Sequence, residues 1–148
     1  MKLTNVFENN RQPVYHACTV KNALDILTSG TLEARTEQTI KGKVVKGVST
    51  TRDMQFALKW NPITFELEAN TIKYNHKMVP VDFLIHKPNH NVKPRDNSEE
   101  FIIGNLENLG KHLKRVMLDK RASQSGYYDD LLDILDDKYH HVEVVYKS

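Results

Sequence analysis

Residues 15–34 read YHACTVKNALDILTSGTLEA, a short apolar stretch followed by a longer amphipathic one. The aromatic and apolar residues over 14–18 are typical of a strand, and Pro13 suits its start. Thr19 is a good helix N-cap, and the apolar residues after it recur at helical spacing as far as Gly30, which suits the position just past a helix C-terminus. The segment therefore predicts a strand that leads directly into a helix ending before Gly30.

Further along the chain, short strands and short helices alternate. Strands are expected at residues 44–49, 63–67, 78–85, 99–103, 114–118 and 141–146, and helices at residues 54–60, 106–113 and 127–135. The alternation of apolar and polar residues over 63–67 predicts a strand with one buried face, and residues 31–42 have so few apolar anchors that we expect a connection there. The pattern predicts the α+β class, with one domain over residues 13–148 behind a polar lead-in over residues 1–12.

Composition limits the class of protein. The 148 residues are 39% hydrophobic and 27% charged, with a mean hydropathy of −0.56 and a formal net charge of +2. This balance excludes a strongly basic histone-like binder and a strongly acidic tail protein. A single cysteine, Cys18, excludes an internal disulfide and a multi-cysteine zinc site. We expect a reducing, cytoplasmic compartment, because no apolar run is long enough to cross a bilayer and the N-terminus lacks the apolar core of a signal peptide.

The small net charge conceals a local separation of signs. Basic residues gather in three stretches: Lys41, Lys43, Lys46 and Arg52; Lys87, Lys93 and Arg95; Lys111, Lys114, Arg115, Lys120 and Arg121. The second stretch lies in a polar loop that we expect over residues 86–98. Acidic residues gather on the expected exposed face of the last helix: Asp129, Asp130, Asp133, Asp136 and Asp137. Such stretches are usually solvated surface, but basic ones beside a cleft would attract a pyrophosphate or a nucleic acid.

Most standard catalytic and metal-binding motifs are missing from the sequence. The seven histidines form no HExxH motif, which argues against a metal site, and no nucleophile elbow, dinucleotide fingerprint or phosphate loop occurs. Cys18 lies on an expected strand and is best explained as a buried, inert thiol. What remains are three segments that place polar groups at strand ends, around His16, Ser49 and Glu99.

The three segments are YHACTVKNALDILTSGTLEA at residues 15–34, GVSTTRDMQFAL at residues 47–58 and SEEFIIGNLENLGKHLKRVML at residues 98–118. They resemble three segments that small ADP-ribosyltransferase-like proteins of phages and bacteria carry in the same order. The resemblance covers residues 13–119. No single segment is specific; the ordered set carries the resemblance. It implies an ADP-ribosyltransferase-like fold with split antiparallel or mixed sheets and short flanking helices. It also implies a cytoplasmic location, which for a phage-encoded protein is the cytoplasm of the host.

The resemblance implies NAD as substrate and no metal. His16 matches a first-strand histidine that hydrogen-bonds a ribose hydroxyl of NAD, and the strand end that begins at Ser49 matches one that shapes the pocket for nicotinamide and its ribose. The implied NAD-binding residues are Tyr15, His16, Ala17, Ser49, Thr50, Thr51, Arg52 and Phe56.

Each of these residues also has a purely structural explanation. His16 would serve as a satisfied structural histidine, and the run that begins at Ser49 as an ordinary connection from a strand to a helix cap. Arg52 would form a local ion pair with Asp53, which also caps the next helix. Phe56 suits stacking on nicotinamide, yet we expect either Phe56 or Trp60 to belong to the core. The sequence leaves these alternatives open.

One of Glu99 and Glu100 matches the catalytic glutamate of the family; strand register slightly favours Glu99, and a solvated strand start is the structural alternative. Cleavage of the nicotinamide–ribose bond builds positive charge on the ribose, as glycoside hydrolysis does. A carboxylate beside the ribose stabilises that charge, holds the 2′-hydroxyl and orients or deprotonates the incoming nucleophile.

The acceptor of ADP-ribose stays open between a protein and a nucleic acid, and the sequence does not set the oligomeric state. Many relatives carry Glu or Gln two residues before the catalytic glutamate, whereas Asn97 or Ser98 stands there in this chain, which speaks against arginine as the acceptor. The same departure favours an alternative: a non-catalytic module on this fold that binds a nucleotide, a nucleic acid or a host protein, as a phage inhibitor would. An RNA phosphotransferase that uses NAD as phosphate acceptor is a third alternative, for which no matched basic residues are evident.

Overall fold

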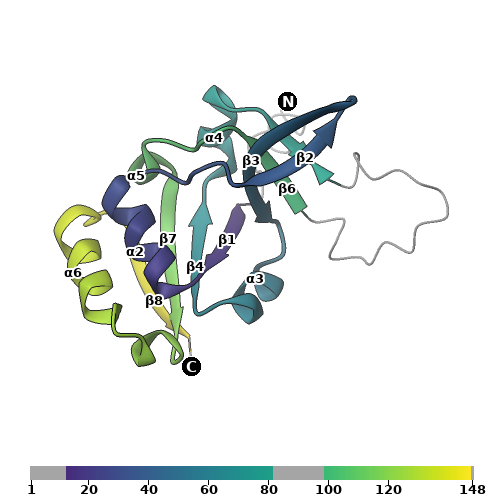
Figure 1. Cartoon of the computed structure of the whole chain (residues 1–148). Coiled ribbons are helices and arrows are strands. Elements are labelled where there is room, and N and C mark those ends of the chain that lie inside the picture. The colour runs from purple at the N-terminus through teal and green to yellow at the C-terminus, as the bar shows by residue number, and fades with distance from the viewer. Residues whose placement is uncertain (1–12, 82–98, 148) are drawn as a thin grey trace, which may run out of the picture.

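The computed structural model describes residues 13–81 and 99–147, which build one mixed sheet with helices on both faces (Figure 1). The strands are β1 (Val14–Cys18), β2 (Thr36–Ile40), β3 (Lys43–Thr51), β4 (Ile63–Leu67), β5 (Met78–Pro80), β6 (Glu99–Ile103), β7 (Leu113–Asp119) and β8 (Glu143–Lys147). The helices are α2 (Val20–Ser29), α3 (Met54–Trp60), α4 (Ala69–Asn75), α5 (Leu109–His112) and α6 (Tyr128–Lys138), with a 3₁₀ turn, η3 (Ala122–Gln124), before α6. The expected α+β class is confirmed.

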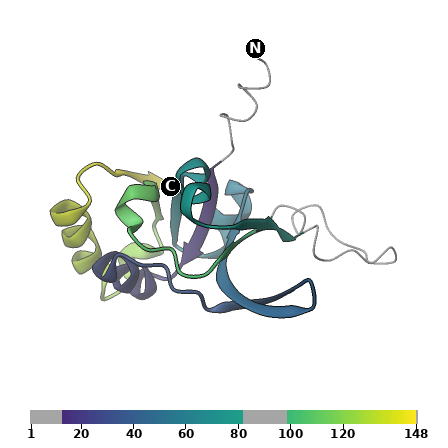
Figure 2. The same ribbon diagram turned by 90° about the horizontal axis from the view of Figure 1, so that it is seen from above.

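The sheet has the strand order β5-β6-β3-β1-β4-β7-β8, and β2 pairs with the first half of β3 outside this path. Every neighbouring pair is antiparallel except β7 and β8. β1 and β3 pair at one register position only, Tyr15 opposite Thr51. Beyond that position the two strands diverge, and the β2–β3 hairpin projects from the body of the molecule (Figure 2). The sheet is therefore nearly split between β1 and β3.

The link from β1 into α2 is set by local sequence, as expected. The Thr19 hydroxyl accepts a hydrogen bond from the Asn22 amide at 3.2 Å and caps the helix. Gly30 ends it with φ of 73°, and its amide donates to the Ile26 carbonyl at 2.8 Å. Because only Thr19 separates the end of β1 from the start of α2, the N-terminal end of α2 stays beside the line along which β1 and β3 diverge.

The main core lies between the sheet and the helices α2 and α6. Leu27 of α2 and Leu131 and Leu135 of α6 are buried there, and full burial of such a side chain stabilises the fold by roughly 1.5–3 kcal/mol. The buried Tyr139 hydroxyl donates a 2.6 Å hydrogen bond to the Leu27 carbonyl, which ties the end of α6 to α2. A smaller apolar cluster of Tyr15, Ala57 and Met117 lies under α3 on the opposite face of the sheet.

The expected connection over residues 31–42 is wrong, because it contains strand β2. Lys41 and Gly42 form the turn between β2 and β3, and both have positive φ, 52° and 80°. A two-residue hairpin turn of this type matches the twist of its strands. The strand has few apolar residues because it lies at the edge of the sheet, so apolar periodicity could not reveal it.

The expected half-buried strand over residues 63–67 is also partly wrong, because all five residues of β4 are buried. β4 lies between β1 and β7, and both faces of the sheet are covered at this point. The buried Glu66 is accommodated by Arg115 of β7, whose Nε lies 3.2 Å from a Glu66 carboxylate oxygen. A charged residue at a position that alternation predicts to be exposed is thus buried as half of an ion pair.

Other expected elements differ in extent. α4 lies where no element was expected, the helix expected over 106–113 shrinks to α5, and the final strand begins at Glu143. Of the strand expected over 78–85, the structure shows β5 and a buried Val81. Residues 82–98, with the expected polar loop and its basic stretch, lie outside the described residues, as does the lead-in over residues 1–12.

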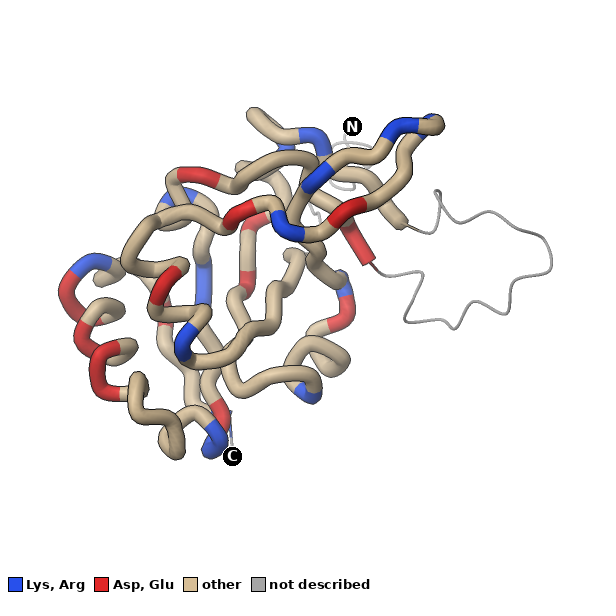
Figure 3. Tube along the Cα trace, viewed as in Figure 1, with Lys and Arg blue, Asp and Glu red and all other residues tan. Residues whose placement is uncertain are grey.

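Charged residues are distributed unevenly over the fold (Figure 3). Lys41, Lys43 and Lys46 lie on the projecting β2–β3 hairpin, while the aspartates of α6 follow the outer side of that helix, across the sheet (Figure 3). The first basic stretch and the acidic face of α6 therefore lie apart, whereas Lys120 and Arg121 of the third basic stretch come just before η3 and α6. None of the described helices is both long and apolar enough to span a membrane.

Gly47 gives a direct test of the packing of β3 against β6. A Cβ atom added to Gly47 would collide with the Ile102 carbonyl oxygen and come within 2.6 Å of the Phe101 ring. We expect Gly47→Ala to lower the free energy of unfolding by about 1–3 kcal/mol in urea titrations, since overpacking forces strands apart. Gly126→Ala is the matched control, because a Cβ there meets nothing within 4 Å. Equal stability of the two variants would contradict the described register.

Candidate functional site

Two adjoining pockets open where β1 and β3 diverge. The first, here called the aromatic pocket, has a volume of about 320 Å³ and is lined by Tyr15, His16, Ala17, Ser49, Thr50, Thr51, Phe56, Ala57, Trp60 and Glu99. The second, here called the helix pocket, has a volume of about 450 Å³ and lies against α2 and the segment that leads to β2. His16, Ala17 and Ser49 line both pockets, so the two are halves of one cleft.

A chain of hydrogen bonds crosses the cleft from β1 to β6. Nδ1 of His16 lies 3.0 Å from the Ser49 carbonyl oxygen, and the Ser49 hydroxyl donates to Oε2 of Glu99 at 2.7 Å. Three residues from three strands, far apart in the sequence, are thus brought to one place. Each of the three quoted sequence segments contributes one of them.

The environment of His16 determines its protonation and tautomer. Burial lowers the pKa of the imidazole, and the bond to the Ser49 carbonyl opposes this only in part. A carbonyl oxygen only accepts hydrogen bonds, so Nδ1 carries the proton. The neutral ring then has an acceptor at Nε2. His16 can therefore accept a hydrogen bond from a hydroxyl in the cleft.

The two adjacent glutamates occupy different environments. Glu99 lines the aromatic pocket and is half-buried. Glu100 points to the other face of β6, is buried, and has a carboxylate oxygen 3.7 Å from Nε of Arg52. Neither Glu100 nor Arg52 lines the aromatic pocket. Of the ten residues expected at the site, these two are the ones that lie beside the cleft rather than in it.

The expected local pair of Arg52 with Asp53 is replaced by two separate interactions. Arg52 approaches Glu100, whereas Asp53 caps α3 by accepting from the Phe56 amide at 3.2 Å. The Asp53 amide in turn donates to the Thr51 hydroxyl at 3.0 Å. This turn determines where α3 begins, and so it determines the position of Phe56 in the pocket wall.

The aromatic wall differs from the expectation that Phe56 or Trp60 is a core residue. Phe56 is half-buried and Trp60 is 68% exposed, so neither belongs to the core. The two rings stack with centroids 5.7 Å apart and planes at 29°. The two residues are one helical turn apart on α3, and both present apolar surface at the mouth of the aromatic pocket.

The remaining expected residues have mainly structural surroundings. The Thr50 hydroxyl donates to the Glu100 carbonyl at 2.8 Å and ties β3 to β6. Burial, with the nearby Glu66 charge, raises the pKa of Tyr15, whose ring packs under α3. Cys18 is buried and burial raises the pKa of its thiol, which agrees with the expected inert role.

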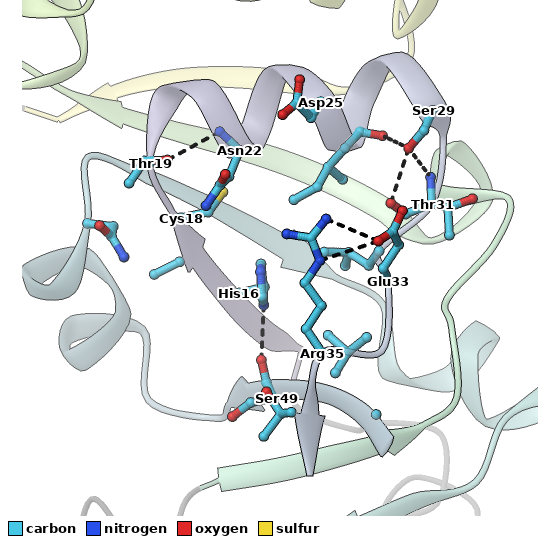
Figure 4. A pocket seen from close by; sticks show the side chains of 17 residues that line it. His16, Cys18, Thr19, Asn22, Asp25, Ser29, Thr31, Glu33, Arg35 and Ser49 are labelled. Atoms are coloured by element: carbon cyan, nitrogen blue, oxygen red, sulfur yellow. Dashed lines mark hydrogen bonds and ion pairs between the residues drawn. The ribbon is translucent and has the colours of Figure 1, made fainter. Parts of the chain in front are cut away.

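The helix pocket was not foreseen from the sequence. Polar side chains line it: Asn22, Asp25, Ser29, Thr31, Glu33 and Arg35. Arg35 pairs with Glu33 at 3.0 Å, and Figure 4 shows the Arg35 side chain extending between His16 and Glu33 toward α2, which runs along the top of the view. Glu33 and Arg35 lie at the end of the first quoted segment and in the supposed connection, where no motif marks them.

The described residues contain no group of three or more His, Cys, Asp or Glu side chains arranged to hold a metal ion. Together the helix and aromatic pockets offer a neutral imidazole, the Glu99 carboxylate on the Ser49 hydroxyl, the Arg35–Glu33 pair, the Asp25 carboxylate and an aromatic wall. These groups suit a polar ligand with hydroxyls, a negative charge and a planar ring.

Solved structures show where this fold occurs elsewhere. No family model matches the sequence, and no curated protein matches it either. DarT of Thermus sp. 2.9 in complex with NAD+ matches with a TM-score of 0.58 over 93% of this chain and 96% of that one, at 12% identity. The chain shares the fold of DarT. The complex of the same protein with carba-NAD+ matches with a TM-score of 0.54 over 94% and 96% of the two chains, again at 12% identity. The expected ADP-ribosyltransferase-like fold is confirmed.

The lowered pKa of His16 predicts how stability depends on pH. The unfolded chain binds a proton on this residue near pH 6.5, whereas the folded chain binds it only at lower pH. The contribution of His16 to the free energy of unfolding is therefore present above about pH 6.5 and is lost as the pH falls. We expect the free energy of unfolding to decrease between about pH 7.5 and pH 5 in wild type and to decrease less in His16→Gln, which keeps a donor for the Ser49 carbonyl.

His112 provides the internal reference for this measurement. Burial, with the nearby charges of His76 and Lys111, also lowers its pKa, so His112→Gln should flatten the same pH range independently. Identical pH profiles of wild type and His16→Gln would contradict the partly buried, neutral state described for His16.

Proposed function

We propose that this protein binds NAD in the cleft between β1 and β3, cleaves the bond between nicotinamide and ribose, and transfers ADP-ribose to a protein or nucleic-acid acceptor. The observation that carries the proposal is the chain from His16 through Ser49 to Glu99. It lies in a cleft of the fold shared with DarT, whose solved structures are complexes with NAD+ and carba-NAD+. The enzyme would be a transferase of the glycosyl type.

The two pockets suit the two halves of the dinucleotide. Nicotinamide and its ribose would occupy the aromatic pocket, with the ring against Phe56, and the adenosine diphosphate half would occupy the helix pocket. His16 lines both, so its Nε2 would accept a hydrogen bond from a ribose hydroxyl at the junction. Arg35 is placed to exchange its exposed pair with Glu33 for the pyrophosphate, a charge-assisted bond of the stronger kind.

Glu99 would be the catalytic carboxylate. The Ser49 hydroxyl holds Oε2, which leaves Oε1 to bind the ribose 2′-hydroxyl. As the bond between ribose C1′ and the nicotinamide nitrogen breaks, its electron pair leaves with the neutral nicotinamide and positive charge develops on the ribose. The carboxylate stabilises that charge, and the acceptor then attacks C1′ and loses its proton.

Glu100 and Arg52 would act as positioning residues. Their ion pair lies on the face of β3 and β6 that does not open into the aromatic pocket. The Glu100 backbone carbonyl holds Thr50, and Glu100 is next to Glu99 in β6. Loss of the Glu100 charge would therefore change the catalytic rate less than loss of the Glu99 charge.

The basic β2–β3 hairpin supports an anionic ligand at this cleft. Lys46 directly precedes Gly47, which lines the helix pocket, and Lys41 and Lys43 continue along the hairpin. Positive charge there would attract the pyrophosphate of NAD or a nucleic-acid acceptor. We propose that the enzyme acts in the cytoplasm, where a single reduced cysteine is usual.

Glu99→Gln is the deciding variant for catalysis. We expect wild type to release nicotinamide from NAD, and the isosteric substitution to slow release about a hundredfold or more, because the developing charge loses its carboxylate. Glu100→Gln is the matched control and should retain most of the rate. The measurement is nicotinamide release followed by chromatography, with NAD binding followed through the fluorescence of Trp60, the one tryptophan of the chain.

The outcomes of this experiment separate the candidate functions. NAD-dependent quenching without nicotinamide release would point to a non-catalytic nucleotide-binding module on the same fold, an alternative favoured by Asn97 and Ser98, which lie outside the described residues. Absence of both quenching and release would overturn the proposal.

Phe56 tests the assignment of nicotinamide to the aromatic pocket. We expect Phe56→Leu to weaken NAD binding about 2–10-fold by calorimetry, since an aromatic stack contributes roughly 0.5–1.5 kcal/mol. Tyr74→Leu, an exposed aromatic substitution on α4, is the matched control and should leave the affinity unchanged. An unchanged affinity in Phe56→Leu would place the nicotinamide elsewhere.

A further inference from the structure

β8 is an edge strand of unusual composition. Its sequence is Glu-Val-Val-Tyr-Lys, and among the described residues it pairs with β7 alone. Val144 is 43% exposed and Tyr146 is 56% exposed, although β-branched and aromatic side chains are the ones that favour strand pairing. An edge of this kind normally needs protection or a partner.

The other edges of the described sheet are protected in the usual ways. β5 has three residues and ends on Pro80, which lacks an amide donor. β2 has the sequence Thr-Glu-Gln-Thr-Ile, with a charged and two further polar side chains in its middle. β8 carries its charges only at its two ends, Glu143 and Lys147, and its three central residues are apolar or aromatic. It is therefore the edge best suited to accept another strand.

The sequence of β8 is complementary to itself in the antiparallel direction. A twofold axis through Val145 places Val145 opposite its copy, Val144 opposite Tyr146 and Glu143 opposite Lys147. Both ends then form opposite-charge pairs, and both flanking positions form aliphatic–aromatic pairs, which are favourable cross-strand combinations. A parallel pairing in register would instead bring like charges together at both ends.

We propose that β8 pairs antiparallel with β8 of a second copy of this chain about Val145, which joins two sheets into one across a symmetric dimer. A twofold interface needs a self-complementary surface, and this strand provides one. The Tyr128 ring, in edge contact with Tyr146 at 6.5 Å, extends the apolar surface beside the strand on each subunit. β4 and β7 separate β8 from β1, so the cleft of each subunit stays open.

Sedimentation equilibrium over a wide range of protein concentration tests association directly. Wild type is expected to pass from monomer to dimer as the concentration rises. Lys147→Glu should raise the dissociation constant roughly tenfold, because it places carboxylates opposite each other at both ends of the paired strands. Lys73→Glu, the same charge change on the exposed surface of α4, should leave the dissociation constant unchanged.

A charge exchange identifies the partner as a second β8. Glu143→Lys and Lys147→Glu should each associate weakly alone, and an equimolar mixture of the two should form a heterodimer with both charge pairs restored. Because Glu143 also lies 3.6 Å from Arg115, thermal unfolding of each variant is compared with wild type first. If both variants fold like wild type and their mixture still associates weakly, the proposed pairing is overturned.

Cysteine substitution tests the register without changing charge. Val145→Cys places two thiols opposite each other on the twofold axis, and oxidised glutathione should convert them to an intermolecular disulfide, with the glutathione reduced. Val144→Cys is the control, since that thiol faces Tyr146 and should cross-link far more slowly. Cys18 is buried and does not compete. The proposal would be overturned if wild type stayed monomeric at every concentration or if the two variants cross-linked equally. A monomeric wild type includes the case in which another segment of the same chain covers β8.

Discussion

The candidate site depends on one constraint, the single register position at which β1 and β3 pair. Tyr15 opposite Thr51 holds the two strands together, and beyond it they diverge. The backbone groups of a divergent pair of strands need other partners. One of them, the Ser49 carbonyl, is satisfied by the His16 ring. The opening in the sheet is thus also the reason that a histidine, a serine and a glutamate meet.

The same opening explains the electrostatics of the cleft. His16 lies where β1 and β3 have diverged, its charged form is disfavoured by burial, and its tautomer is determined by a backbone acceptor. Ser49 uses its carbonyl for His16 and its hydroxyl for Glu99, which orients a carboxylate toward the pocket without neutralising it. Both features are those of a preorganised polar cleft, with one hydrogen-bond acceptor and one carboxylate held in place.

The ion pair between Glu66 and Arg115 affects the strands on the other side of β1. Glu66 is buried in β4 and reaches Arg115 of β7, which in turn approaches Glu143 of β8. A buried ion pair contributes little net stability but makes removal of either partner costly. It therefore favours one arrangement of β4, β7 and β8, in which β4 and β7 separate the cleft between β1 and β3 from the edge strand β8.

Local elements were the part of the fold that residue patterns predicted well. β1, α2 and α3 occur where the strand composition, the Thr19 and Asp53 caps and Gly30 place them, because these signals act over a few residues. β2 was missed because an edge strand buries little and needs no apolar repeat. The burial of Glu66 and Thr64 was missed because it depends on α3 covering the second face of the sheet.

The sequence by itself determined the α+β class and indicated the three segments that line the cleft. Tertiary structure alone decided that Glu99 faces the cleft while Glu100 pairs with Arg52, since adjacent strand residues point to opposite faces and only the pairing of β3 with β6 settles which face is which. It also decided that Glu33 and Arg35 line a second pocket, because that pocket exists only where α2 and β3 meet across the opening in the sheet.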